Sequence, residues 1–262
     1  MDSELLSVSM KGEGSAVILL HGLFGSSDNL SRLAIELEKE YQVFSVDLRN
    51  HGKSFHHKEM TYPLMVEDIK KMMNVYGINS AHLIGHSMGG KVAMSFALSY
   101  PEKVKKLIVA DIAPVTYSPH HQAILKALTS IPLDSIATRR EADEYLARYI
   151  DEAGVRQFLL KSLMLSKKQA PVWKFNLSAI IENYDKILSG NDSSKQFNGD
   201  TLFIAGGKSD YIKAEYKQKT MALFPKAQLK IMPETSHWLH AEKPKIFISI
   251  CQRFLEENNK YD

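Results

Sequence analysis

The apolar residues of this chain follow two alternating patterns. Short continuous apolar runs are typical of buried strands, and apolar residues three and four positions apart are typical of helices that cover a sheet. Strands are predicted at 16–20, 42–46, 81–84, 104–110, 201–205 and 228–232. Helices are predicted at 29–39, 63–76, 88–99, 214–224 and 244–255. This alternation of strands and helices predicts an α/β protein with a mostly parallel sheet flanked by helices.

The alternation stops between about Val115 and Lys195, where every apolar spacing is helical and no strand is predicted. Four helices are expected there, marked by apolar residues at 124–128, 142–149, 158–163 and 177–184. We therefore expect a sheet domain made of residues 1–114 and 195–262, interrupted by an all-helical insertion of residues 115–194.

Composition and charge exclude several classes of protein. The 44% hydrophobic and 24% charged residues are typical of a globular domain, and the net charge of +3 is too small to indicate nucleic-acid binding. Cys251 is the single cysteine, so no internal disulfide is expected. The acidic first residues do not resemble a signal peptide, and the apolar runs are shorter than the roughly 20 residues that span a bilayer. We expect a cytoplasmic protein that does not insert into membranes, and its oligomeric state is left open.

The segment 85–89, Gly-His-Ser-Met-Gly, matches the pattern G-x-S-x-G. It follows one predicted strand and opens a predicted helix, which is the setting of a sharp turn that holds a nucleophilic serine above a sheet. Small neighbours are needed at such a turn. Ser87 is therefore predicted to be a nucleophile, and the alternative is an ordinary N-cap at a glycine-rich helix start.

A serine hydroxyl needs a base, and the chain has ten histidines. His237 follows Ser87 in chain order and also lies just after the last predicted strand, as a catalytic histidine of this kind does. His240 is the alternative, although its position favours the start of a helix. His86 is expected to point away from the solvent side of the turn, and His51 to lie in a polar turn.

Two aspartates are candidates for the acid that orients His237. Asp111 follows the strand 104–110, and Asp210 follows the strand 201–205 through a short loop. Both lie at carboxyl ends of predicted strands, so the residues alone leave both possibilities open.

Acyl transfer also requires N–H donors for the negative charge that develops on the carbonyl oxygen. The N–H of Met88, at the start of a helix, is one expected donor. The second is expected in the glycine-containing loop 21–25, where position favours Leu23 and leaves Phe24 as the alternative.

Several segments together resemble the α/β-hydrolase superfamily, and most closely the bacterial YbfF-type esterases. They are residues 21–26, 47–54, 85–91 and 237–244, with 154–162 as a further match within the insertion. The resemblance implies an eight-stranded type of core, a helical cap over the site, and hydrolysis of short acyl esters and acyl-CoA thioesters. It also implies that the acid is Asp111.

The sequence therefore predicts a serine hydrolase that cleaves small ester or thioester substrates through an acyl-enzyme. No cofactor or metal is predicted, and residues 85–90 lack the Lys-Ser/Thr of a nucleotide-binding loop. Arg148, Arg156 and Lys161 are hypothesised to bind the phosphates of CoA, with a solvated helix face as the alternative. The other functions considered are a cofactor-free C–C bond hydrolase or lyase and a non-catalytic binding protein of the same fold.

Overall fold

The computed structural model describes residues 4–166, 169–191 and 194–257. Across these residues, seven strands form one sheet in the order β1-β3-β2-β4-β5-β8-β9. They are β1 (Val8–Lys11), β2 (Ser15–Leu20), β3 (Tyr41–Val46), β4 (Ala81–His86), β5 (Val104–Ala110), β8 (Asp200–Gly206) and β9 (Ala227–Met232). β1 is antiparallel to β3, and the other pairs are parallel. The mostly parallel sheet confirms the predicted fold class.

The edge strand β1 was absent from the prediction, because it has only four residues and three of them are exposed. The expectation of an eight-stranded core is wrong, because the central sheet of the described residues has seven strands. The predicted helix at 29–39 is a 3-10 turn, Ser27–Leu30, followed by helix α1 (Ser31–Leu37). The predicted helix at 214–224 is likewise a 3-10 turn, Ala214–Tyr216, followed by α9 (Lys217–Leu223).

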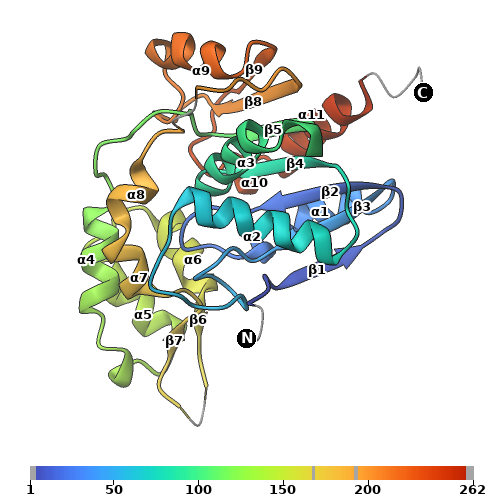
Figure 1. Ribbon diagram of the computed structural model, residues 1–262. Coiled ribbons are helices and arrows are strands. Elements are labelled where there is room, and N and C mark those ends of the chain that lie inside the picture. The colour runs from blue at the N-terminus through green and yellow to red at the C-terminus, as the bar shows by residue number, and fades with distance from the viewer. Residues whose placement is uncertain (1–3, 167–168, 192–193, 258–262) are drawn as a thin grey trace.

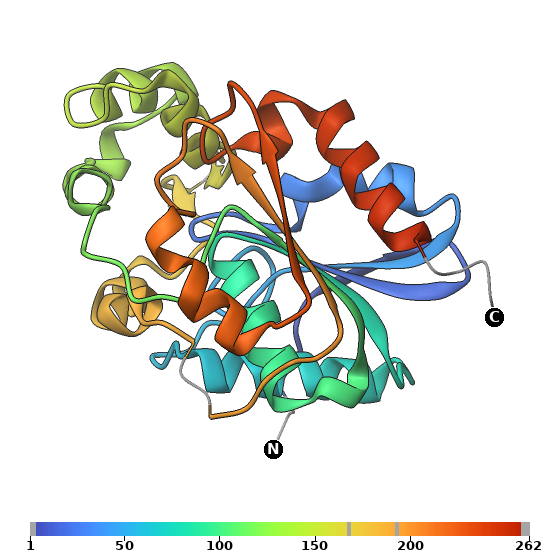
Figure 2. The ribbon, with the colours of Figure 1, turned by 90° about the horizontal axis from the view of Figure 1, so that it is seen from above.

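Helices cover both faces of the sheet (Figures 1 and 2). α1, α10 (Leu239–Glu242) and α11 (Pro244–Glu256) cover one face, and α2 (Tyr62–Val75), α3 (Met88–Ser99) and α9 cover the other. Adjacent residues of the central strands alternate between two apolar clusters, with Leu83 and Leu107 in one and Ile84 and Ile108 in the other. This burial on both faces explains why the strands read as continuous apolar runs. No helix in the described parts of the chain is long and apolar enough to cross a membrane.

The strand order brings the segments that carry the candidate chemistry to one edge of the sheet. β4 lies between β2 and β5, with Leu20 opposite Gly85 and His86 opposite Ala110. The residues that follow these strands, among them Ser87 and Asp111, therefore meet at the carboxyl edge.

The segment between β5 and β8 gathers beside this edge, on the left in Figure 1. Its helices are α4 (Gln122–Ser130), α5 (Arg139–Leu146), α6 (Ala153–Lys161), α7 (Leu177–Glu182) and α8 (Tyr184–Leu188). The expectation that it is all helical is wrong, because β6 (Leu163–Met164) and β7 (Val172–Trp173) form an antiparallel pair. Strands of two residues are too short to give a periodic pattern. We propose that residues 115–194 form a cap unit on a core of residues 1–114 and 195–262.

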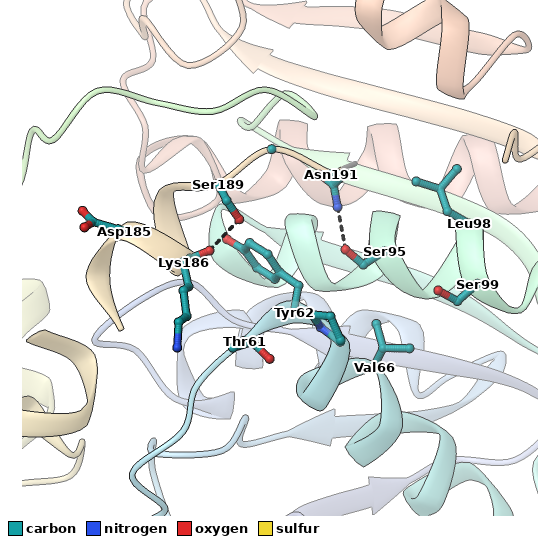
Figure 3. Close-up of a pocket in the computed structure, with 12 residues that line it drawn as sticks. Thr61, Tyr62, Val66, Ser95, Leu98, Ser99, Asp185, Lys186, Ser189 and Asn191 are labelled. Atoms are coloured by element: carbon teal, nitrogen blue, oxygen red, sulfur yellow. Dashed lines mark hydrogen bonds between the residues drawn. The ribbon is translucent and has the colours of Figure 1, made fainter. Parts of the chain in front are cut away.

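Lys91 of α3 ties both connections of the cap to the core. Its Nζ donates to the carbonyl of Val115 (2.5 Å) on the entering segment and to that of Ser189 (2.6 Å) on the leaving segment. The amide of Asn191 donates to the carbonyl of Lys91 (2.9 Å) and to Oγ of Ser95 (2.7 Å; Figure 3). Burial lowers the pKa of Lys91 to about 7. The cap is therefore anchored to α3, the helix that begins directly after the candidate nucleophile, Ser87.

Candidate active site

Ser87 occupies a strained turn between β4 and α3. Its φ of +53° lies in the left-handed region, which a residue other than glycine adopts only where the surrounding structure enforces it. A Cβ at Gly85 would collide with the carbonyl of Gly89, and one at Gly89 with the carbonyl of Leu20. The N–H of Ser87 donates to the carbonyl of Ala110 (3.0 Å) on the neighbouring strand. The sequence therefore needs glycine at both positions to hold the serine above the sheet.

The structure brings Ser87, His237 and Asp111 into one hydrogen-bonded chain. Nε2 of His237 lies 2.9 Å from Oγ of Ser87, and Nδ1 of the same ring lies 2.7 Å from Oδ2 of Asp111. With the Nδ1 proton donated to the carboxylate, the lone pair of Nε2 accepts the hydroxyl proton of Ser87. This arrangement is able to remove a proton from Oγ.

The two candidate acids occupy opposite environments. Asp111 is fully buried, and its carboxylate accepts the N–H of Gly206 (2.8 Å) and the hydroxyl of Ser209 in addition to His237. Asp210 points into solvent with 94% of its side chain exposed and lies 3.7 Å from Nζ of Lys213. The structure places Asp111, and not Asp210, beside the imidazole.

His237 is also held by two aromatic neighbours. The ring of Tyr211 stacks on the imidazole at 3.9 Å and 21°. The hydroxyl of Tyr117 donates to the carbonyl of Tyr211 (2.6 Å), which ties this residue to the cap. Nε2 of His86 donates to the carbonyl of His237 (2.9 Å), and burial holds the pKa of His86 well below its usual value. These contacts fix the loop that carries His237.

The alternative base, His240, lies away from Ser87. It sits on α10, as its position in the sequence predicted, with its ring 4.3 Å from that of His86. Burial lowers its pKa to about 3. His240 therefore packs behind the site and does not face the hydroxyl.

The loop after β2 lies against Ser87. A Cβ built on Gly22 would lie 3.3 Å from Cβ of Ser87. Nδ1 of His21 donates to the carbonyl of Gly22 (2.8 Å), while its Nε2 accepts the N–H of Leu48 (3.0 Å). The Gly22 carbonyl and the Leu23 N–H belong to one trans peptide, so they point in opposite directions. Fixing this carbonyl also fixes the direction of the Leu23 N–H.

The N–H of Phe24, the alternative donor, is already engaged. It donates to Nε2 of His51 (3.1 Å), which is a fully buried side chain. The geometry therefore favours the N–H groups of Leu23 and Met88 as the pair available to a ligand at Ser87. The sequence reading placed His51 in a turn and did not find this contact, because no local pattern indicates a partner 27 residues away.

A cleft of about 630 Å³ opens at Ser87 and His237, between the core loops and the cap. Most of its cap wall is apolar, with Ile124, Val155 and Phe158, whose ring lies 4.1 Å from that of Trp238. His120, His121 and Glu152 are polar residues of this wall. A second cavity of about 520 Å³ lies between α2, α3 and the segment that leaves the cap (Figure 3). Ser87, His237 and Asp111 do not line it, so the candidate site is the first cleft.

The structure does not bring Arg148, Arg156 and Lys161 to this cleft. Arg156 forms a partly buried ion pair with Asp143 (3.0 Å) and donates to the carbonyl of Ile150 (2.8 Å). The guanidinium of Arg148 lies over the ring of Tyr145, and Lys161 lines a separate cavity beside α1. These three residues therefore do not form the phosphate site hypothesised from the sequence. Within the described residues, histidine, cysteine and carboxylate side chains do not cluster in groups that could hold a metal ion.

The fold and the Ser-His-Asp arrangement define the class, an α/β-hydrolase. Residues 15–149 match the family described as the alpha/beta hydrolase fold, and the chain belongs to this family. The structure of a marine microorganism esterase is 41% identical, with a TM-score of 0.92 over 96% of this chain and 100% of that chain.

Two curated relatives are similar to this chain over most of its length. Esterase YbfF of Escherichia coli K12 is 36% identical over 93% of this chain and 94% of its own length. The sn-1-specific diacylglycerol lipase ABHD11 of Danio rerio is 38% identical over 94% of this chain and 80% of its own. The resemblance to YbfF-type esterases is confirmed, and the chain is a hydrolase of the esterase and lipase type.

Proposed function

We propose that the protein hydrolyses small carboxylic esters through an acyl-enzyme on Ser87. The observation that carries this proposal is the continuous chain from Ser87 Oγ through His237 to Asp111, in a cleft that is open to solvent. In this account Ser87 is the nucleophile, His237 the general base and acid, and Asp111 the group that keeps the Nδ1 proton in place.

In the acylation step, Oγ of Ser87 attacks the carbonyl carbon while its proton moves to Nε2 of His237. The negative charge on the carbonyl oxygen is stabilised by the N–H groups of Leu23 and Met88. When the tetrahedral intermediate collapses, the bond to the alcohol oxygen breaks and this oxygen takes the proton from His237. A water molecule, activated by the same imidazole, then releases the acid and regenerates Ser87.

The walls of the cleft support an apolar substrate. Ile124, Val155 and Phe158 of the cap line the same cleft as Ser87, and they suit the acyl or alcohol group of a small ester. Acyl-CoA thioesters share the same chemistry and form a second proposed class. The positions of Arg148, Arg156 and Lys161 give no electrostatic support for CoA, so we place simple esters first.

A substrate panel tests this function. The enzyme is assayed with p-nitrophenyl esters, acyl-CoAs and vinylogous diketones, and Ser87 is labelled in parallel with a fluorophosphonate. Ester turnover that the label abolishes supports the proposal. Turnover of the diketones alone would identify a C–C bond hydrolase, and labelling without any turnover would identify a binding protein.

A further inference from the structure

We infer that His51 is a positioning residue for the oxyanion loop, and that it acts by holding the N–H of Phe24. This inference rests on the proposed function, because it concerns the geometry of the donors that face the acyl oxygen. Its basis is a set of contacts between the loop after β2, the turn after β3 and the cap.

The imidazole of His51 is held as a neutral acceptor. Its Nδ1 donates to the carbonyl of Arg49 (2.9 Å), which leaves the lone pair of Nε2 to accept the N–H of Phe24 (3.1 Å). The side chain is fully buried, and this burial, followed by the nearby His21, lowers the pKa of His51 to about 3. The ring therefore stays uncharged, and Nε2 remains an acceptor over the working pH range of most enzymes.

Phe24 is buried, so its N–H needs an acceptor, and its backbone is strained as well. Its φ is +62°, a left-handed conformation that a bulky side chain adopts only under constraint. The cap supplies two further constraints, since Oγ of Ser162 donates to the Phe24 carbonyl (2.7 Å) and Phe175 packs on its ring (5.2 Å). His51 is the partner of the remaining backbone group, the N–H.

The consequence concerns Leu23, which lies between two fixed peptides. His21 fixes the peptide before it through the Gly22 carbonyl, and His51 fixes the peptide after it through the Phe24 N–H. The rings of His21 and His51 lie 5.2 Å apart, so the two contacts form one unit. Without the acceptor, Phe24 would carry an unpaired buried donor, and a backbone shift at Leu23 that lets this N–H find another partner would move the Leu23 N–H relative to the oxyanion.

The test compares His51→Leu with His51→Gln, in which Oε1 can replace Nε2 as the acceptor. His56→Leu is the control, because His56 is an exposed histidine of the same loop. We expect His51→Leu to lower kcat for a p-nitrophenyl ester about ten- to a hundredfold with KM within about threefold. This is less than the roughly 10²–10³ that loss of a whole oxyanion donor costs. His51→Gln should recover most of the activity, and His56→Leu should match the wild type.

A pair of inhibitors separates positioning from a merely structural role. A trifluoromethyl ketone forms a tetrahedral oxyanion on Ser87, whereas the matching methyl ketone binds mainly without reaction. We expect His51→Leu to weaken the trifluoromethyl ketone by the same factor as kcat/KM and to leave the methyl ketone unchanged. Equal weakening of both ketones, or unchanged kcat in a folded His51→Leu protein, would overturn the inference.

If His51→Leu does not fold, His51→Gln is compared with His51→Asn, whose shorter side chain does not reach the Phe24 N–H. The Gln variant should be at least about tenfold more active, and equal activities would overturn the inference. A wild-type protein that turns over no ester would instead contradict the proposed function.

Discussion

Nδ1 of His237 lies 2.7 Å from the carboxylate of Asp111, although the two residues are 126 positions apart in the chain. The contact forms because β5 lies directly beside β4, so the residue after β5 is at the same edge as Ser87. The loop after β9 returns across β8 to this edge, where Ser236 and Gly206 are in close backbone contact. A parallel sheet thus assembles the site from three distant segments.

The first prediction separates the two candidate acids. Asp111→Asn should lower kcat by about 10⁴, because the amide offers the wrong hydrogen-bonding partner to Nδ1 of His237. Asp210→Asn is the matched control and should stay within about threefold of the wild type, since the side chain of Asp210 is exposed and lies beside Lys213 rather than bonded to His237. Steady-state kinetics with one ester measure kcat for both variants. A large loss in Asp210→Asn with little change in Asp111→Asn would contradict the assignment.

The second prediction concerns the glycines of the serine turn. Gly89→Ala should destabilise the fold, because its Cβ would meet the backbone carbonyls of Leu20 and His21 and α3 would have to move away from β2. Gly154→Ala is the control, since its Cβ would have no neighbour within 4 Å and alanine favours a helix by up to about 1 kcal/mol. Thermal unfolding should show a lower Tm for Gly89→Ala and an equal or higher Tm for Gly154→Ala. Equal values for both would be inconsistent with this packing.

The third prediction is a loss of stability at mildly acidic pH. Burial lowers the pKa of several histidines below the usual 6.5, to about 4 for His82 and about 3 for His51, His121 and His240. Between these values and 6.5 the unfolded chain binds more protons than the folded chain. The free energy of unfolding should therefore fall as the pH decreases, by up to about 1.4 kcal/mol per pH unit for each such group.

Urea unfolding at about pH 7 and about pH 5.5 measures this dependence. His82→Gln should reduce the difference between the two pH values, because it removes one buried histidine that lies on β4 and outside the cleft. An unfolding free energy that stays constant or rises on acidification would show that the buried histidines do not control stability.

The fourth prediction concerns the basic residues of the cap. Arg148→Ala and Lys161→Ala together should leave KM for an ester and for a short acyl-CoA unchanged, because neither residue lines the cleft at Ser87. Arg156 is kept in this variant, since its ion pair with Asp143 supports the cap. A several-fold rise in KM for the acyl-CoA that disappears at high salt would restore an electrostatic role for these residues.

The sequence was sufficient to predict the six parallel strands of the sheet, because strands buried on both faces are continuous apolar runs. It predicted Ser87 for a similar reason, since the serine turn needs its strand, glycines and helix in a continuous stretch. It did not predict the exposed edge strand β1. The pair β6 and β7 was not predicted, because two-residue strands have no period. The reading of the cap as entirely helical was wrong for the same reason.

Features that depend on contacts between distant segments could not be predicted from neighbouring residues in the sequence. Asp111 and Asp210 both follow strands, and only the three-dimensional structure shows that one carboxylate is buried beside His237 while the other faces solvent. Arg156 is a basic residue on a helix, and its ion pair with Asp143 is invisible in the spacing of residues. His51 was read as a turn residue because its contact with Phe24 joins two separate loops.

The most direct test of the central claim is to trap the acyl-enzyme. The wild-type protein and Ser87→Ala are mixed rapidly with a p-nitrophenyl ester, the release of p-nitrophenol is followed, and the quenched protein is digested for mass spectrometry. The account predicts an acyl adduct on the peptide that contains Ser87, and a Ser87→Ala protein that is folded by circular dichroism but retains less than about 1% of the activity. An adduct on another residue, or ester hydrolysis above that level by a folded Ser87→Ala protein, would contradict it.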